Sequence, residues 1–172
     1  MNHVALQPIQ VAERPRWELE AFHRSPSYRM DLVALFTMLD ELPFRSMLDV
    51  GSGTGLVVRE ARGRHPGRRI DGVDRFDFSA SASTRRLRKR YDVMTAVHAL
   101  NDVPHLDRAA ATMAEHLTAG GHVVVVNPNP AFTWIGIEYL DPRILDRVMA
   151  QHGLRRMRRL EYGNELLVYR KN

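Results

Sequence analysis

Residues 48–55 read Leu48-Asp49-Val50-Gly51-Ser52-Gly53-Thr54-Gly55, a short apolar run that ends in a glycine-rich turn. We expect a buried strand over residues 46–50 and a helix over residues 56–64. Glycine allows a sharp turn at position 51, close approach of a ligand at 53 and close helix packing at 55. Leu56 stands where a dinucleotide fold needs glycine, and no Gly-Lys-Ser/Thr follows. The turn therefore argues against NAD and ATP; a nucleoside site or a purely structural turn remains.

Asp74 favours the nucleoside site. It ends the next predicted strand, residues 69–74, and follows the turn by about 20 positions, where βαβ units place the acid that binds ribose. A carboxylate suits this role because it accepts hydrogen bonds from both hydroxyls of a vicinal diol.

The remaining pattern alternates strands with helices. We expect a helix from Pro15, a second helix over residues 27–41, and then strands and helices in turn up to a closing hairpin. Ser27 is the expected N-cap of the second helix, and Met30 and Val33 belong to its apolar face. The later elements are a strand at 91–97, a helix at 106–117 ended by Gly120-Gly121, a strand at 123–126, a helix at 142–152 begun by Asp141-Pro142, and hairpin strands at 154–162 and 165–170.

This order predicts an α/β fold: a Rossmann-like, mostly parallel sheet with helices on both faces and a C-terminal antiparallel hairpin. We divide the chain into an N-terminal helical cap, residues 1–45, and a ligand-binding domain, residues 46–172. Only 16 residues, 75–90, separate Asp74 from the strand at 91–97. A helix, a strand and two loops need about 20 or more. We therefore expect one element, the third strand, to be missing.

Composition excludes several classes of protein. The 172 residues are 44% hydrophobic and include no cysteine, so we expect a globular, cytoplasmic protein without disulfides, thiolate sites or a bound metal. No apolar stretch is long enough for a membrane helix. The net charge of +5 is concentrated in arginine clusters at 85–90 and 155–159, which form either a phosphate-binding surface or a solvated one. Because no aromatic residues alternate with these arginines, we do not expect a nucleic-acid partner.

Several motifs in order resemble the class I S-adenosylmethionine-dependent methyltransferases. Residues 48–55 resemble the first motif of that family and Gly72-Val73-Asp74 the second. Residues 91–100 are similar to its fourth strand and the exit from it, and residues 117–125 to the approach to its fifth strand. The resemblance covers residues 47–126 in register, and the closing hairpin agrees with the family's last two strands.

The resemblance implies roles for the matched positions. Asp49 and the turn residues Gly51, Ser52, Gly53 and Gly55 would face the methionine part of S-adenosylmethionine, and Asp74 would bind its ribose. Phe76 would lie against adenine or pack in the core. His98, at the exit of the fourth strand, would sit beside the methyl group, and it is the candidate catalytic base because imidazole titrates near neutral pH.

Aromatic, amide and imidazole side chains are the candidates for contact with the acceptor. The segment after the 123–126 strand begins with Asn127 and carries Trp134 and Tyr139; the N-terminal helices contribute His23 and Tyr28. Because no insertion enlarges the carboxyl edge of the sheet, this geometry suits a small molecule better than a protein or a duplex.

Three functions remain open at this point. The first is methyl transfer to a small metabolite or natural-product intermediate. The others are a methyltransferase-like binding or regulatory partner without this activity, and an enzyme that uses the same cofactor for a cyclisation or rearrangement. The exposed edge expected at residues 69–74 leaves a homodimer through that edge open.

Overall fold

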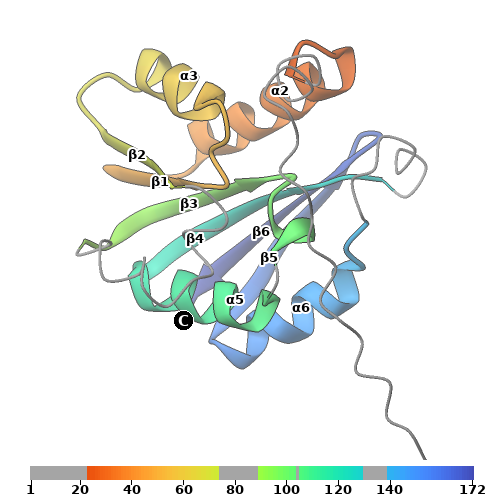
Figure 1. The fold of residues 1–172 in the computed structure, drawn as a ribbon. Helices are drawn as coiled ribbons and strands as arrows, with labels where there is room; N and C mark the ends of the chain where they lie inside the picture. Colours follow the sequence, from red (N-terminus) through yellow and green to blue (C-terminus); the bar gives the residue numbers. More distant parts are fainter. Residues whose placement is uncertain (1–22, 74–88, 104, 130–138) are drawn as a thin grey trace, which may run out of the picture.

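A six-stranded sheet forms the centre of the computed structural model, which describes residues 23–73, 89–103, 105–129 and 139–172 (Figure 1). The strands lie in the order β2-β1-β3-β4-β6-β5. Their bounds are β1 Ser46–Val50, β2 Arg69–Val73, β3 Tyr91–Val97, β4 Leu117–Asn127, β5 Leu154–Glu161 and β6 Glu165–Lys171. β1 pairs in parallel with both β2 and β3, β3 pairs in parallel with β4, and β6 is antiparallel to β4 and β5. The predicted mostly parallel sheet with a C-terminal hairpin is confirmed.

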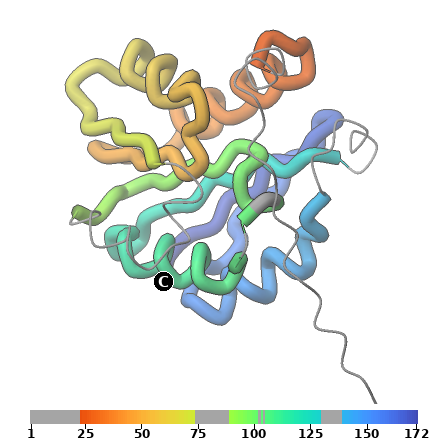
Figure 2. Tube along the Cα trace, viewed as in Figure 1, coloured from red at the N-terminus to blue at the C-terminus, as the bar shows by residue number. Residues whose placement is uncertain are grey.

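Helices cover both faces of this sheet, as predicted (Figures 1 and 2). α2 (Pro26–Glu41) and α3 (Leu56–Arg64) pack on one face, where Leu35 and Ala61 share a core with Val124. α5 (Leu106–His116) and α6 (Pro142–Gln151) pack on the other, where Met113 and Met149 join a second core. Side chains 123–126 are all buried between these layers, which is why an unbroken valine run is stable there.

The start and the buried face of α2 differ from the prediction. Ser25, not Ser27, is the N-cap, because its side chain accepts a hydrogen bond from the Tyr28 amide and Pro26 occupies the first turn. Met30 and Val33 are 53% and 58% exposed, so the predicted apolar face was wrong at these two positions. The inward face contains Tyr28, Asp31, Leu35, Phe36, Met38 and Leu39.

The α2 helix is also part of the main core, since its buried residues pack with β1, β3 and β4. The division at residue 45 therefore does not coincide with a break in packing. The predicted helix from Pro15 lies outside the described residues.

The glycines at 120 and 121 do not follow α5 as its stop signal. The helix ends at His116, and both glycines lie in β4, which begins at Leu117. The β3–β4 register shifts between Tyr91 and Val93, where the chain of β4 takes up extra residues. A side chain at Gly121 would come within 2.9 Å of the Asp92 carbonyl oxygen, so close backbone packing requires glycine here.

The arginine cluster at 155–159 lies on β5, the last strand of the described sheet. Arg156 pairs with Asp146 of α6, Arg158 with Glu41 of α2, and Arg159 with Glu161 and Glu165. The ion pairs favour the solvated, structural interpretation over a phosphate-binding surface. Together with the register shift between Arg156 and Arg158, these charges protect an exposed strand against pairing with another chain.

At the other end of the described sheet lies β2. We predict that the third strand is missing between residues 75 and 90, and most of that segment lies outside the described residues. The missing strand and the homodimer through this edge therefore stay predictions. Among the helices that the structure describes, none has both the length and the apolar character to cross a membrane.

Asp92 fastens the amino ends of the parallel strands together. One carboxylate oxygen accepts hydrogen bonds from the backbone amides of Arg45 and Ser46, at 2.8 and 3.0 Å, and from the Ser46 hydroxyl at 3.0 Å. The other accepts from Thr118 at 3.2 Å. These donors lower the pKa of Asp92 against the opposing effect of burial.

We expect Asp92→Ala to lower the free energy of unfolding by about 2 kcal/mol, because amides that bonded to a carboxylate lose their partner. Urea unfolding at pH 7 measures the change. A lowered pKa stabilises the fold above the ordinary pKa and ceases to do so as the pH falls, so the deficit should shrink below about pH 4. Glu115→Gln, on the exposed side of α5, is the control; equal effects of the two changes would contradict this role.

Candidate functional site

The carboxyl ends of β1 and β3 form the centre of the candidate site. The chain leaves β1 toward β2 on one side, then returns to β3 on the other, so the connections diverge at this point of the sheet. Open α/β sheets bind ligands in the crevice at such a switch point. The glycine turn, Asp49 and His98 all lie at these two strand ends.

The glycine turn is held to the end of β2. Gly51, Gly53 and Gly55 have φ angles of 76°, 49° and 74°, the left-handed region that favours glycine. The amides of Gly51 and Ser52 donate to the Val73 carbonyl oxygen at 2.8 and 3.1 Å, and the Gly55 amide donates to the Ser52 carbonyl oxygen at 2.7 Å. The backbone conformation of the turn thus favours glycine at all three positions.

The predicted packing role of Gly55 was wrong. Among the described residues, a Cβ added at Gly55 would meet no atom within 4 Å, and one added at Gly53 would meet the Gly51 carbonyl oxygen alone, at 3.9 Å. The close contact lies at Gly72 instead, where a Cβ would come within 2.8 Å of Val58 and 3.0 Å of Ser52. Gly72 therefore lets α3 and the turn approach β2.

We expect Gly72→Ala to lower the free energy of unfolding by about 1–3 kcal/mol, since the new methyl group overlaps the side chains of Val58 and Ser52. Gly63→Ala is the matched control. Position 63 lies inside α3, and a Cβ there would have no neighbour within 4 Å in the part of the chain that the structure describes. That change should stabilise the protein by about 0.5–1 kcal/mol. Chemical denaturation of both variants distinguishes the two effects, and a neutral Gly72→Ala would contradict the packing argument.

Asp49 is a buried carboxyl group beside the turn. It is 2% exposed and accepts a hydrogen bond of 2.6 Å from the Thr95 hydroxyl of β3. Burial raises the pKa of Asp49 to about 7, and the Thr95 hydrogen bond opposes part of that effect. A bound cation would favour the ionised form of this carboxyl group, so the position suits a positively charged ligand.

The raised pKa makes stability depend on pH. The folded state holds a proton on Asp49 at pH values where the unfolded chain has lost it, so stability decreases as the pH rises from about 4 through about 7. Asp49→Asn should match the parent protein at about pH 4 and exceed its free energy of unfolding at pH 8 by roughly 1–4 kcal/mol. Urea titrations at the two pH values measure this; equal differences at both would count against it. Glu60→Gln, on the exposed side of α3, is the control.

His98 follows β3 and is held in an unusual backbone conformation. Its φ of 49° is the sole positive value for a residue other than glycine in the described ranges. Its amide donates to the Val126 carbonyl oxygen at 2.9 Å, and its Nε2 lies 2.7 Å from Asp31 Oδ2. Strained backbone of this kind occurs at functional sites where the surroundings hold it in place.

The α2 residue Asp31 is fully buried and joins three parts of the fold. Besides the His98 contact, it accepts hydrogen bonds from the Tyr162 hydroxyl at 2.9 Å and from the Asn164 amide at 2.8 and 3.1 Å. Tyr162 and Asn164 lie at the β5–β6 turn. One carboxylate therefore ties the first turns of α2 to the exit of β3 and to the closing hairpin.

Five side chains form a row from the glycine turn to Asp31, which we call the carboxyl-edge row. Thr54 Oγ1 lies 3.0 Å from His23 Nδ1. The ring centroids of His23 and Tyr28 are 4.5 Å apart, and those of Tyr28 and His98 are 6.1 Å apart. Asp31 completes the row. The predicted candidates His23, Tyr28 and His98 thus lie together at the turn, although their roles stay predictions.

Burial, Asp49 and Asp31 all raise the pKa of Tyr28. The phenol therefore remains protonated at neutral pH and can donate a hydrogen bond.

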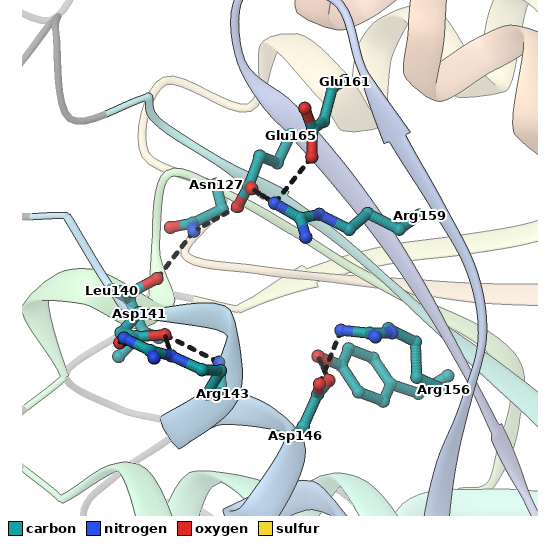
Figure 3. Close-up of polar contacts among 10 residues, drawn as sticks. Asn127, Leu140, Asp141, Arg143, Asp146, Arg156, Arg159, Glu161 and Glu165 are labelled. Carbon is teal, nitrogen blue, oxygen red and sulfur yellow. Dashed lines mark hydrogen bonds and ion pairs between the residues drawn. The ribbon is translucent and has the colours of Figure 1, made fainter.

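Asn127 is the last residue of β4, and its side chain takes part in a separate polar network (Figure 3). Asn127 is 1% exposed; its amide donates to the Leu140 carbonyl oxygen at 2.8 Å and to Glu165 at 3.2 Å, and its oxygen accepts from Asn101. These contacts account for the side chain of Asn127 without a substrate. Tyr139 is half-buried, and burial raises its pKa. Asp74, Phe76 and Trp134 lie outside the described residues.

The sequence analysis did not identify the side chains that hydrogen-bond to the candidate site residues. The burial of Asp31 could have been predicted. It lies three residues after Tyr28 and four before Leu35, so the three side chains share one face of the helix. Thr95, Tyr162 and Asn164 carried no such signal, because their contacts depend on distant elements. Within the described ranges, no three His, Asp or Glu side chains form a group that could hold a metal ion.

Comparison with protein families agrees with this arrangement. A model described as a methyltransferase domain matches residues 19–165. The chain belongs to this methyltransferase family. The matched residues include α2 and all five members of the carboxyl-edge row. The comparison with curated proteins found no match.

Solved structures of methyltransferases share the fold. The N-methyltransferase NodS from Bradyrhizobium japonicum WM9, in complex with S-adenosyl-L-homocysteine, is 14% identical; the match covers 86% of this chain and 89% of that one, with a TM-score of 0.63. A putative O-methyltransferase from Nostoc punctiforme PCC 73102 is 16% identical, covering 98% of this chain and 64% of that one, with a TM-score of 0.69. Human N-acetylserotonin methyltransferase, in complex with SAM, is 17% identical, with 96% and 62% covered and a TM-score of 0.61.

Proposed function

We propose that this chain binds S-adenosylmethionine at the glycine turn and transfers its methyl group to a small-molecule acceptor. The observation that carries the proposal is the turn itself: three glycines at positive φ, directly after β1 and beside the switch point of the sheet. Membership of a methyltransferase family supports it, and so do structural neighbours solved in complex with S-adenosyl-L-homocysteine or SAM.

The residues present fit this cofactor. Within the described ranges, a Cβ at Gly53 or Gly55 would have no atom closer than 3.9 Å, which supports a turn whose backbone a ligand can approach. Asp49 provides a buried carboxyl group that suits the positive charges of the cofactor. In our proposal the turn and Asp49 hold the methionine part, Ser52 lies beside it, and Asp74, predicted from the sequence, binds the ribose.

The acceptor would lie along the carboxyl-edge row. The cofactor supplies an activated methyl group, so the protein's main task is to hold the acceptor in line with that group. Tyr28, kept protonated by its surroundings, can donate a hydrogen bond to an acceptor. His98, with Nε2 beside Asp31, is the candidate to receive a proton on its other ring nitrogen. Its side chain is only 5% exposed, so a bound acceptor, rather than bulk water, would exchange that proton.

A calorimetric titration tests cofactor binding. S-adenosylmethionine and S-adenosylhomocysteine should both bind the parent protein, whereas Gly53→Val should weaken both at least tenfold, because a branched side chain fills the approach and is strained at positive φ. Circular dichroism reports whether the variant remains folded. Gly63→Ala, in α3 and away from the turn, should retain the parent affinity. Absence of binding to the parent protein, or unaltered binding to folded Gly53→Val, would overturn the proposal.

A further inference from the structure

Asp49 is a buried carboxyl group whose described neighbours offer it no positive charge. It is 2% exposed, and its described hydrogen-bond partner is the Thr95 hydroxyl, at 2.6 Å. In the part of the chain that the structure describes, no lysine, arginine or histidine forms an ion pair with it. Removing an ionised carboxylate from water is costly unless a charged partner compensates it, so burial favours the neutral acid.

The elements packed around Asp49 supply uncharged groups or groups that already have partners. Because alternate residues of a strand share a face, Asp49 points with Met47 toward α2 and α3. Its register partners in β2 and β3 are a glycine and a threonine, and the buried residues of α3 are apolar. The titratable side chains nearby are those of Tyr28, Asp31 and His98. The Tyr28 phenol stays protonated at neutral pH, and Asp31 lies 2.7 Å from the His98 ring.

The same carboxyl group lies next to the turn that we propose as the ligand site. Asp49 comes two residues before Gly51, and the amides of Gly51 and Ser52 fix the turn to the Val73 carbonyl oxygen. In the proposed function the methionine part of S-adenosylmethionine lies here. That part carries a sulfonium and an ammonium group against one carboxylate, so the ligand brings the positive charge that the described residues do not supply.

We infer that binding of S-adenosylmethionine at the turn ionises Asp49 and releases its proton to the solvent. The inference rests on the proposed function, because it needs the positive groups of this ligand beside Asp49. The carboxyl O–H bond breaks, its electron pair stays on the carboxylate, and the proton passes to water. The Thr95 hydroxyl suits both forms, since it can accept a hydrogen bond from the neutral acid and donate one to the carboxylate.

Proton release makes the affinity for the cofactor depend on pH. Burial raises the pKa of Asp49 in the free protein to about 7. Below that pH, binding has to remove a proton, whereas above it the carboxylate is already present. The affinity should therefore rise about tenfold from pH 6 to pH 8. A modest change of pH around neutrality would thus regulate how much of the protein holds cofactor.

Isothermal titration with S-adenosylmethionine, in buffers that differ in ionisation enthalpy, counts the protons released on binding. The parent protein should release about one proton per ligand at pH 6 and almost none at pH 8.5. Asp49→Asn should release none at either pH, and its affinity should change by no more than about twofold between them. Glu60→Gln, on the exposed side of α3, is the matched control and should behave like the parent protein.

Thr95→Val provides a second test that keeps the carboxyl group. The Thr95 hydrogen bond lowers the pKa of Asp49 against the effect of burial. Removal of the hydroxyl should therefore move the pH at which proton release falls to half its maximum to a higher value. Thr95→Ser keeps a hydroxyl at this position and should retain the parent profile. Circular dichroism at both pH values reports whether each variant is folded.

The outcomes separate the inference from the proposed function. If S-adenosylmethionine does not bind the parent protein, both are overturned. If it binds without releasing a proton at pH 6, or if Asp49→Asn releases as many protons as the parent protein, only the inference fails. If Asp49→Asn binds too weakly to measure, the Thr95→Val profile decides: a shift to higher pH supports the inference, and an unshifted profile overturns it.

Discussion

β1 and β3 lie side by side in parallel, with Asp49 opposite Thr95, although α3 and β2 come between them in the chain. This pairing forces the connections to leave the sheet in opposite directions, and the space between them is where a ligand can lie. The glycine turn must then bend sharply to reach α3, and His98 must leave β3 with a positive φ. The features of the site therefore follow from one strand pairing in the middle of the sheet.

Two carboxyl groups at this edge are buried by different means. Asp49 meets a single hydroxyl, and its raised pKa shows that burial favours its neutral form. Asp31 instead contacts several polar side chains, from the exit of β3 and from the β5–β6 turn. Burying a polar group is costly unless it is hydrogen-bonded, and these contacts offset that cost for Asp31. The two carboxyl groups thus differ in how far hydrogen bonds compensate their burial.

Local signals in the sequence were sufficient for much of the fold. Apolar runs and glycine or proline boundaries located β1, α3 and β3, and Asp141 caps α6 as predicted. Errors arose where tertiary packing overrides local pattern. Gly120 and Gly121 resemble a helix stop but lie in β4, where Gly121 permits a close strand contact, and Met30 fits a helical apolar pattern but faces outward. The same holds for the candidate site. A local motif predicts the glycine turn, whereas the partners of His98 belong to elements that are remote in the chain, so no local pattern predicts them.

The α2 helix serves two purposes along its length. Its first turns carry Tyr28 and Asp31 to the carboxyl edge, whereas Leu35, Phe36 and Leu39 further along are locked into the core. Substitutions in the first turns would therefore alter the carboxyl edge, while the later turns keep the fold intact. Two turns of one helix can thus vary without a change in the rest of the core.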